Sequence, residues 1–238
     1  MQYAYILIGL FCLVAFSSSI AQDMTAEEVM EQLELKAGSV IDFETTITGE
    51  LIDFSGAALE LEVFLQFLRE ENVGRAEFIQ PDILADNFIV LDKDTVYNYL
   101  FLTNQVTVYD ATDPNAFGGL IPEASESDID LFLGLDPERL FKGWKGTVLD
   151  YIEADADSPV GNLYHLRFDN DFDTTTDVGY VVAWVVDEEW YPYKLEIYMP
   201  DSEGPVVTLQ FNDLVQDQNL DPLDVAYVPD DAEVIDER

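Results

Sequence analysis

The stretch that decides the fold is residues 190–236, WYPYKLEIYMPDSEGPVVTLQFNDLVQDQNLDPLDVAYVPDDAEVID. Apolar and polar residues alternate in two runs, 191–199 and 205–214, and a turn rich in Asp, Ser, Gly and Pro separates them. This pattern predicts two antiparallel strands. An Asn-Leu-Asp-Pro turn follows at 219–222, and a short run ending at 236 predicts a closing strand.

The same period of two begins near residue 41, and the clearest strand covers residues 58–70. Its apolar side chains fall on one face: Leu59, Leu61, Val63, Leu65 and Phe67. Close turn signals separate the strands, which indicates an antiparallel meander and not βαβ units. Further strands are expected at 75–80, 88–91, 95–100, 105–109, 146–154, 162–169 and 178–187, so that the chain has about eleven strands.

Helical signals lie at two places. Thr25 and Glu28 form a capping box, Val29 and Leu33 belong to one apolar stripe, and Gly38 favours a stop, which predicts a helix over 25–37. A second helical patch follows a loop at 111–126, with apolar positions Ile129, Phe132, Leu140 and Phe141. With no internal repeat and no linker, residues 22–238 are expected to form one domain.

The N-terminus resembles a secretory signal peptide. An apolar run from Tyr5 to Phe16 precedes small residues at Ser19 and Ala21, which suits cleavage before Gln22. The run is too short to cross a membrane comfortably. The only cysteine, Cys12, lies within it, so the mature chain 22–238 has no disulfide and no thiol nucleophile.

The chain is very acidic, with 49 Asp and Glu against 10 Lys and Arg and a net charge of −39. Such a surface excludes nucleic acid as a partner and disfavours anionic lipid headgroups. The acids are spread along the chain, which argues against a disordered tail. We expect a salty working environment that screens this repulsion.

Catalytic signals are weak. The lone histidine, His165, has no nucleophile motif to serve, and the Asp-rich stretch 169–173 fails the pattern of a calcium loop. No carboxylate pair stands out for hydrolysis. The sequence therefore predicts a non-enzyme without cofactor or metal. By contrast, residues 178–186 are apolar on both faces, as in a strand that lines a cavity, belongs to a plain core or meets another subunit.

Several motifs, in this order and spacing, resemble the outer-membrane lipoprotein carrier (LolA) family and its lipoprotein-sorting relatives over about 25–236. They are FIQPD at 78–82 with ADNFIVLD at 85–92, TVYNY at 95–99 with NQVTV at 104–108, and QNLDP at 218–222 with YVPDDAEV at 227–234. The resemblance implies an α+β, mostly β fold: a strongly curved antiparallel half-barrel with helices covering its concave face.

The resemblance also implies a soluble, exported, periplasmic carrier that binds acyl chains of a lipoprotein or lipid and sorts them toward the outer membrane. Partners would be that cargo, an inner-membrane donor and an outer-membrane acceptor. The expected cavity is lined by Val29, Leu33, Leu59, Leu61, Val63, Leu65, Phe67, Val182 and Trp184, and the expected lid contains Ile129, Phe132, Leu140 and Phe141. Arg69 corresponds to the arginine that holds the family's lid closed, although the proline that follows it in the carrier is absent. The alternative is an envelope sensory or structural interaction domain without lipid.

Overall fold

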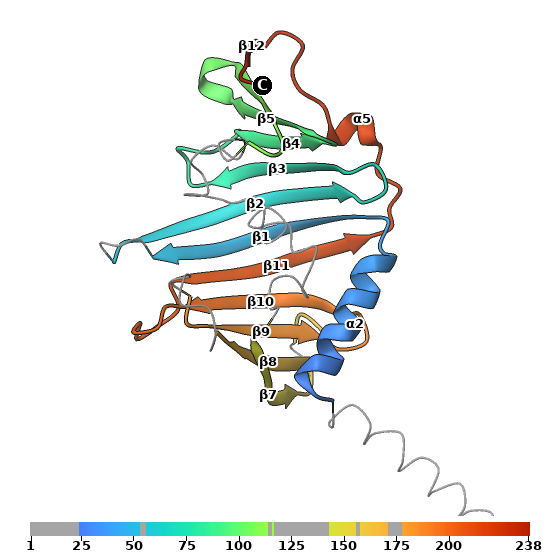
Figure 1. The fold of residues 1–238 in the computed structure, drawn as a ribbon, viewed down its shortest axis with the longest axis vertical. Coiled ribbons are helices and arrows are strands. Elements are labelled where there is room, and N and C mark those ends of the chain that lie inside the picture. The colour runs from blue at the N-terminus through green and yellow to red at the C-terminus, as the bar shows by residue number, and fades with distance from the viewer. Residues whose placement is uncertain (1–23, 53–55, 114–115, 117–142, 156–157, 171–177) are drawn as a thin grey trace, which may run out of the picture.

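The computed structural model describes residues 24–52, 56–113, 116, 143–155, 158–170 and 178–238. Within these ranges, twelve strands form one sheet in the order β12-β6-β5-β4-β3-β2-β1-β11-β10-β9-β8-β7 (Figure 1). The strands are β1 Asp42–Ile52, β2 Ala58–Leu68, β3 Val73–Gln80, β4 Phe88–Asp92, β5 Thr95–Leu100, β6 Gln105–Asp110, β7 Lys145–Ile152, β8 Leu163–Asp169, β9 Tyr180–Val186, β10 Tyr191–Tyr198, β11 Val207–Gln216 and β12 Glu233–Asp236. The mostly β character is therefore confirmed.

The expected antiparallel meander holds with one exception. All ladders are antiparallel except that between β12 and β6, which is parallel. The reason is the path of the chain: β11 pairs with β1 in the middle of the sheet, and the chain then crosses through the short helix α5 (Pro222–Val225) to the far edge. Closing strand β12 consequently adds beside β6 in a direction that its local pattern does not encode.

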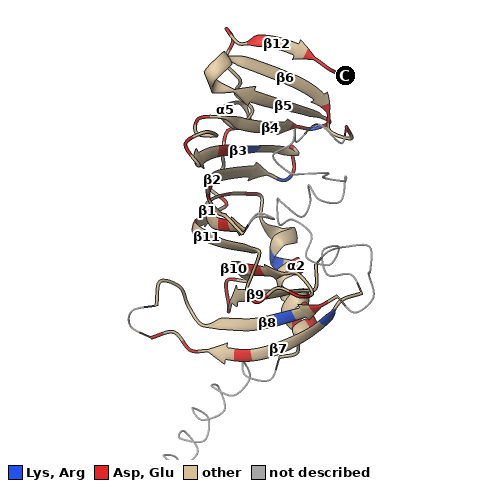
Figure 2. Ribbon diagram, turned by 90° about the vertical axis from the view of Figure 1, so that its left-hand side faces the viewer, with Lys and Arg blue, Asp and Glu red and all other residues tan. Residues whose placement is uncertain are grey.

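One helix, α2 (Ala26–Ser39), packs against the sheet at its β7–β10 end. Thr25 is its N-cap, and the predicted capping box with Glu28 is present. Seen edge-on, the sheet bows, and α2 lies on the inside of the bend (Figure 2). We call this side the inner face and the opposite side the outer face. The second predicted helical patch lies outside the described residues, so a layer of several helices over the inner face is not seen.

Two apolar clusters occupy the inner face. Cluster 1 joins α2 to β8 and β9 through buried Ala26, Val29, Leu33, Tyr164, Leu166, Phe168, Ala183 and Val185. Cluster 2 covers β1 to β5 at the other end and consists of Ile47, Val63, Leu65, Ala76, Phe78, Ile89, Val96 and Ala116. The sheet therefore has a buried apolar layer at each end of the same face.

Among the described residues, the outer face is covered near β2–β6, by the segment that runs through α5 and beyond it. Its Ala226, Val228 and Ala232 pack on buried Phe88, Val90, Tyr99 and Val106. Arg75 fixes this segment because its guanidinium donates to the carbonyl of Tyr227 at 2.9 Å and lies over the Phe88 ring. At the start of the crossing, the buried carboxylate of Asp42 accepts the backbone N–H groups of Gln218 and Leu220. No helix among the described residues has the length and apolarity needed to cross a membrane.

Candidate functional site

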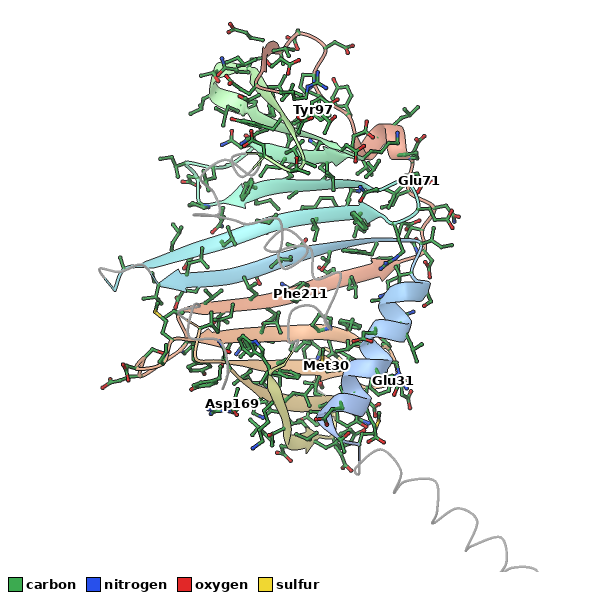
Figure 3. The ribbon with its side chains drawn as sticks, viewed as in Figure 1. Met30, Glu31, Glu71, Tyr97, Asp169 and Phe211 are labelled. Carbon is green, nitrogen blue, oxygen red and sulfur yellow. The ribbon has the colours of Figure 1, made fainter. Side chains whose placement is uncertain are left out.

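The candidate site is an apolar strip on the inner face between the two clusters. Alternation along β10 and β11 brings its five members to one side, and the pairings Leu195 with Leu209 and Ile197 with Val207 place them next to each other. We call them the central strip: Leu195, Ile197, Val207, Leu209 and Phe211. Figure 3 shows Phe211 in the middle of the sheet, on the same side as Met30 of α2.

The central strip differs from its surroundings in burial. All five side chains are half-buried, whereas Leu65 of cluster 2 and Leu166 of cluster 1 are 1% and 0% exposed. The middle of a twelve-stranded sheet is the place where a closed core would bury side chains most completely. A half-open apolar strip at this place is a surface that an apolar ligand could cover.

Local packing shapes the strip. Gly49 of β1 pairs with Leu209 of β11, and a Cβ at Gly49 would come within 2.9 Å of the Leu209 side chain. The absence of a side chain at Gly49 therefore lets Leu209 lie across β1. On the neighbouring pair, Phe211 faces Ile47, which connects the strip to cluster 2.

Most of the predicted lining residues lie on the inner face. Val63 and Leu65 are buried in cluster 2, Leu61 packs against it, and Phe67 contacts Phe43 with ring centroids 6.1 Å apart. Leu59, at the start of β2, is 42% exposed. On α2, the predicted residues Val29 and Leu33 are buried in cluster 1.

Val182 and Trp184 lie on the outer face, so the predicted lining set is divided between the two sides of the sheet. Trp184 stacks on His165 at 4.6 Å between ring centroids, with Lys194 at 4.7 Å from its ring. Their neighbours Ala183 and Val185 face α2 instead. Because β9 is apolar on both faces, its pattern cannot tell which side the helix covers, and a shift of one residue exchanges the two sets.

The expected lid residues Ile129, Phe132, Leu140 and Phe141 lie outside the described residues. The described chain contacts the inner face on both sides of this range: Ala116 is buried in cluster 2, and Trp144 packs against cluster 1.

Arg69 contacts the C-terminal end of α2. Its Nε donates to the carbonyl of Val40 at 3.1 Å, and its Nη2 donates to the carbonyl of Ala37. A cation at this end of a helix satisfies free carbonyls and favours the helix dipole. Arg69 thus fastens α2 to the end of β2, while its role toward a lid stays a prediction.

The outer face of β8–β10 carries a group of interacting polar and charged side chains. Lys194 and Tyr198 both donate to Glu196 at 2.7 Å. Burial raises the pKa of Glu196, but these two hydrogen bonds outweigh it and leave the pKa below its ordinary value. Burial lowers the pKa of His165. Across the described ranges, no three His, Cys, Asp or Glu side chains converge as metal ligands would.

A signal for the central strip is present in the sequence, although it does not stand out there. Leu195 and Ile197 alternate with Lys194 and Glu196, and Leu209 lies between polar neighbours in VTLQF. The period of two predicts both strands, but the patterns of 58–70 and 178–186 are stronger, so the expected cavity lining comes from those strands instead.

Comparison with known proteins shows the fold. No family profile matches the chain, and no characterised protein matches its sequence. An uncharacterised conserved protein from Thermus thermophilus shares the fold at a TM-score of 0.58, with 17% identity over 89% of this chain and 98% of that one. MucB matches at a TM-score of 0.53, with 13% identity, and the match spans 88% of this chain and 65% of MucB.

A LolA superfamily protein from Nitrosomonas europaea is also among the matching structures, with a TM-score of 0.39 and 13% identity over 84% of this chain and 97% of that chain. The described sheet is curved and unclosed, as the sequence motifs implied, and the Thermus thermophilus protein and MucB share this fold. At these identities the likeness concerns the fold alone.

Proposed function

We propose that this chain is an exported, non-enzymatic carrier that binds the acyl chains of a lipoprotein or lipid on the inner face of its sheet. The central strip is the observation that supports this proposal, because apolar side chains in the middle of the sheet are only half-buried between two buried clusters. In this proposal, residues 1–21 direct export to the periplasm and are removed.

The energetics favour an acyl chain as the ligand. Burial of ten methylene groups contributes roughly 8 kcal/mol before the cost of ordering the chain is subtracted. An acyl chain has no polar group that needs a partner, and the strip offers apolar side chains from β10 and β11 with no charge among them. A water-soluble polar ligand would instead require hydrogen-bonding groups on this face.

In the proposed cycle, an inner-membrane donor loads the chain and an outer-membrane acceptor receives its cargo. The net charge of −39 makes nucleic acid an unsuitable partner. Release of cargo from an apolar face costs the burial energy just gained, so the acceptor has to offer a comparable apolar surface.

A second candidate is an envelope interaction domain without lipid, and the outer face of β8–β10 favours it. Half-buried Trp184, Arg167 and Tyr198 lie there uncovered by any described segment, and aromatic and arginine side chains are enriched at protein interfaces. This candidate predicts a protein partner on the outer face and no cargo on the inner face.

Native mass spectrometry tests the proposal. The mature chain, from Gln22 onward, is purified from the cell envelope without detergent and weighed before and after organic extraction. Adducts of lipid mass that disappear on extraction support the carrier function and give the cargo class. An unmodified mass that stays unchanged after incubation with lipids and an acylated peptide contradicts it and favours the interaction domain.

A matched pair of variants locates the site. Leu209 faces inward and Thr208, its neighbour on the same strand, faces outward beside Glu196. Leu209→Gln is expected to lower lipid occupancy several-fold, and Thr208→Gln to leave it unchanged, provided both retain the wild-type melting temperature within a few degrees. Equal occupancy in the two variants would contradict a site on the inner face.

A further inference from the structure

Large apolar side chains are exposed together at one corner of the sheet. We call the five of them the apolar rim, and their exposed fractions are Ile79 42%, Ile83 77%, Leu100 41%, Phe101 52% and Leu102 87%. Single exposed apolar residues are common on protein surfaces, but five on two turns at the same end of the sheet indicate an interaction site.

Two turns build the apolar rim, and a hydrogen bond connects them. The first joins β3 to β4, and the second is the short 3-10 helix η2 (Phe101–Thr103) between β5 and β6. Both lie at the same end of the sheet, on the left in Figure 1. The buried side chain of Asn87 in the first turn accepts the N–H of Phe101 in the second at 2.8 Å. The two turns therefore form one surface.

Hydrogen bonds from Asn104 and within the first turn fix the conformation of these turns. Asn104 adopts a left-handed backbone conformation with φ 48°, its side-chain oxygen accepts from the Tyr99 hydroxyl, and its amide donates to the carbonyl of Asp231. Within the first turn, the N–H of Leu84 donates to the carbonyl of Pro81 at 2.8 Å. These hydrogen bonds therefore fix the backbone of both turns while the side chains of the apolar rim remain exposed to water.

The charges around the rim restrict what it can bind. Residues 79–87 and 100–104 contain no Lys or Arg, and the exposed acids of the first turn are Asp82 and Asp86. With a net charge of −39, such a tip is repelled by anionic lipid headgroups. A convex apolar tip without cations fits the boundary between headgroups and acyl chains in an electrically neutral bilayer.

We propose that the apolar rim docks this protein on the surface of a zwitterionic lipid bilayer. Phe101, Leu102 and Ile83, the most exposed of the five, would enter the interfacial layer. The docked turns would lie next to the inner face, because Leu84 of the first turn packs against cluster 2, which includes Phe78 and Ile89. A path for acyl chains from the bilayer to the inner face would follow from this position, and this path rests on the proposed function. Docking itself does not rest on it.

Flotation with phosphatidylcholine vesicles tests the docking. The double variant Phe101→Ser/Leu102→Ser removes two exposed side chains that belong to none of the buried clusters, and it is expected to reduce the vesicle-bound fraction at least tenfold. The matched control is Leu35→Ser/Leu223→Ser, which removes two side chains of 62% and 80% exposure elsewhere on the surface, on α2 and α5. The control is expected to bind as the wild type does.

The outcomes separate docking from the carrier function. No binding of the wild type to phosphatidylcholine vesicles, or equal losses in both double variants, overturns the docking proposal. Binding that increases with added phosphatidylglycerol also overturns it, because the charge argument predicts a decrease. Uptake of monomeric lysophosphatidylcholine, followed by native mass spectrometry, reports on the inner face: a wild type that floats with vesicles but takes up no lysolipid keeps the docking proposal and refutes the carrier.

Discussion

Replacing Arg69 with Met is expected to loosen α2 from the sheet. The guanidinium donates to two backbone carbonyls at the C-terminal end of the helix, those of Ala37 and Val40. Met keeps most of the apolar stem of the side chain but provides no donor. Because Val40 is buried, water cannot fully replace the lost hydrogen bond at that carbonyl.

The magnitude follows from the number and kind of these bonds. A hydrogen bond from a charged donor contributes about 1.5–3 kcal/mol when it is shielded, and less when water can take its place. Ala37 is half-exposed, so only one of the two carbonyls is well shielded. We therefore expect Arg69→Met to lower the free energy of unfolding by about 2–3 kcal/mol, with a smaller loss for Arg69→Lys, which keeps the charge near the helix dipole.

Urea unfolding, followed by circular dichroism and tryptophan fluorescence, measures this loss. Arg238→Met is the matched control: the Arg238 side chain also makes two hydrogen bonds, both to Asp236, but the pair is exposed and should not contribute measurably. If Arg69→Met unfolds at the same urea concentration as Arg238→Met, Arg69 does not fasten α2 to β2, and the role assigned to it here is wrong.

Three further predictions concern packing, pH and salt. A Cβ at Gly146 would lie 2.7 Å from the Cβ of Ala26 where α2 approaches β7, so Gly146→Ala should cost about 1–3 kcal/mol of stability in urea unfolding, while the same change at the open Gly38 should not destabilise to this extent. Burial lowers the pKa of His165 from 6.5, so the unfolded chain binds a proton more readily, and stability present above pH 6.5 should be lost as the pH falls below it. The charged groups that face His165 are Asp150, Glu196 and Lys194. His165→Gln should show a shallower loss over this range, and an identical pH profile would contradict this assignment. With a net charge of −39, the melting temperature should rise between low and molar salt, and a flat response would argue against self-repulsion as a significant cost.

Local signals were sufficient for the elements themselves. The capping box at Thr25 begins α2 as predicted, and the alternation over β2 correctly assigned Val63 and Leu65 to the same apolar face. Such signals depend on a few neighbouring residues and on the period of the backbone, so they can be found in the sequence. The curved, unclosed sheet was expected from the order of several short motifs, none of which is specific alone.

Pairing between strands that lie far apart in the chain could not be predicted from these local signals. The central strip joins cluster 2 because β11 pairs with β1, which lies far from it in the chain, and no local pattern states that pairing.

By itself, then, the sequence determined a mostly β chain with one capped helix, an acidic surface and no recognisable catalytic group. Only the tertiary structure decided which face of β9 meets α2, and therefore that Trp184 lies outside while Ala183 lies inside. The physical reason is that a strand apolar on both sides satisfies its periodicity in either orientation, and the register with its neighbours selects one. The path of the chain through α5 placed β12 in parallel beside β6, and the pairing of β11 with β1 and β10 left Leu209 and Phe211 half-buried in the middle of the sheet.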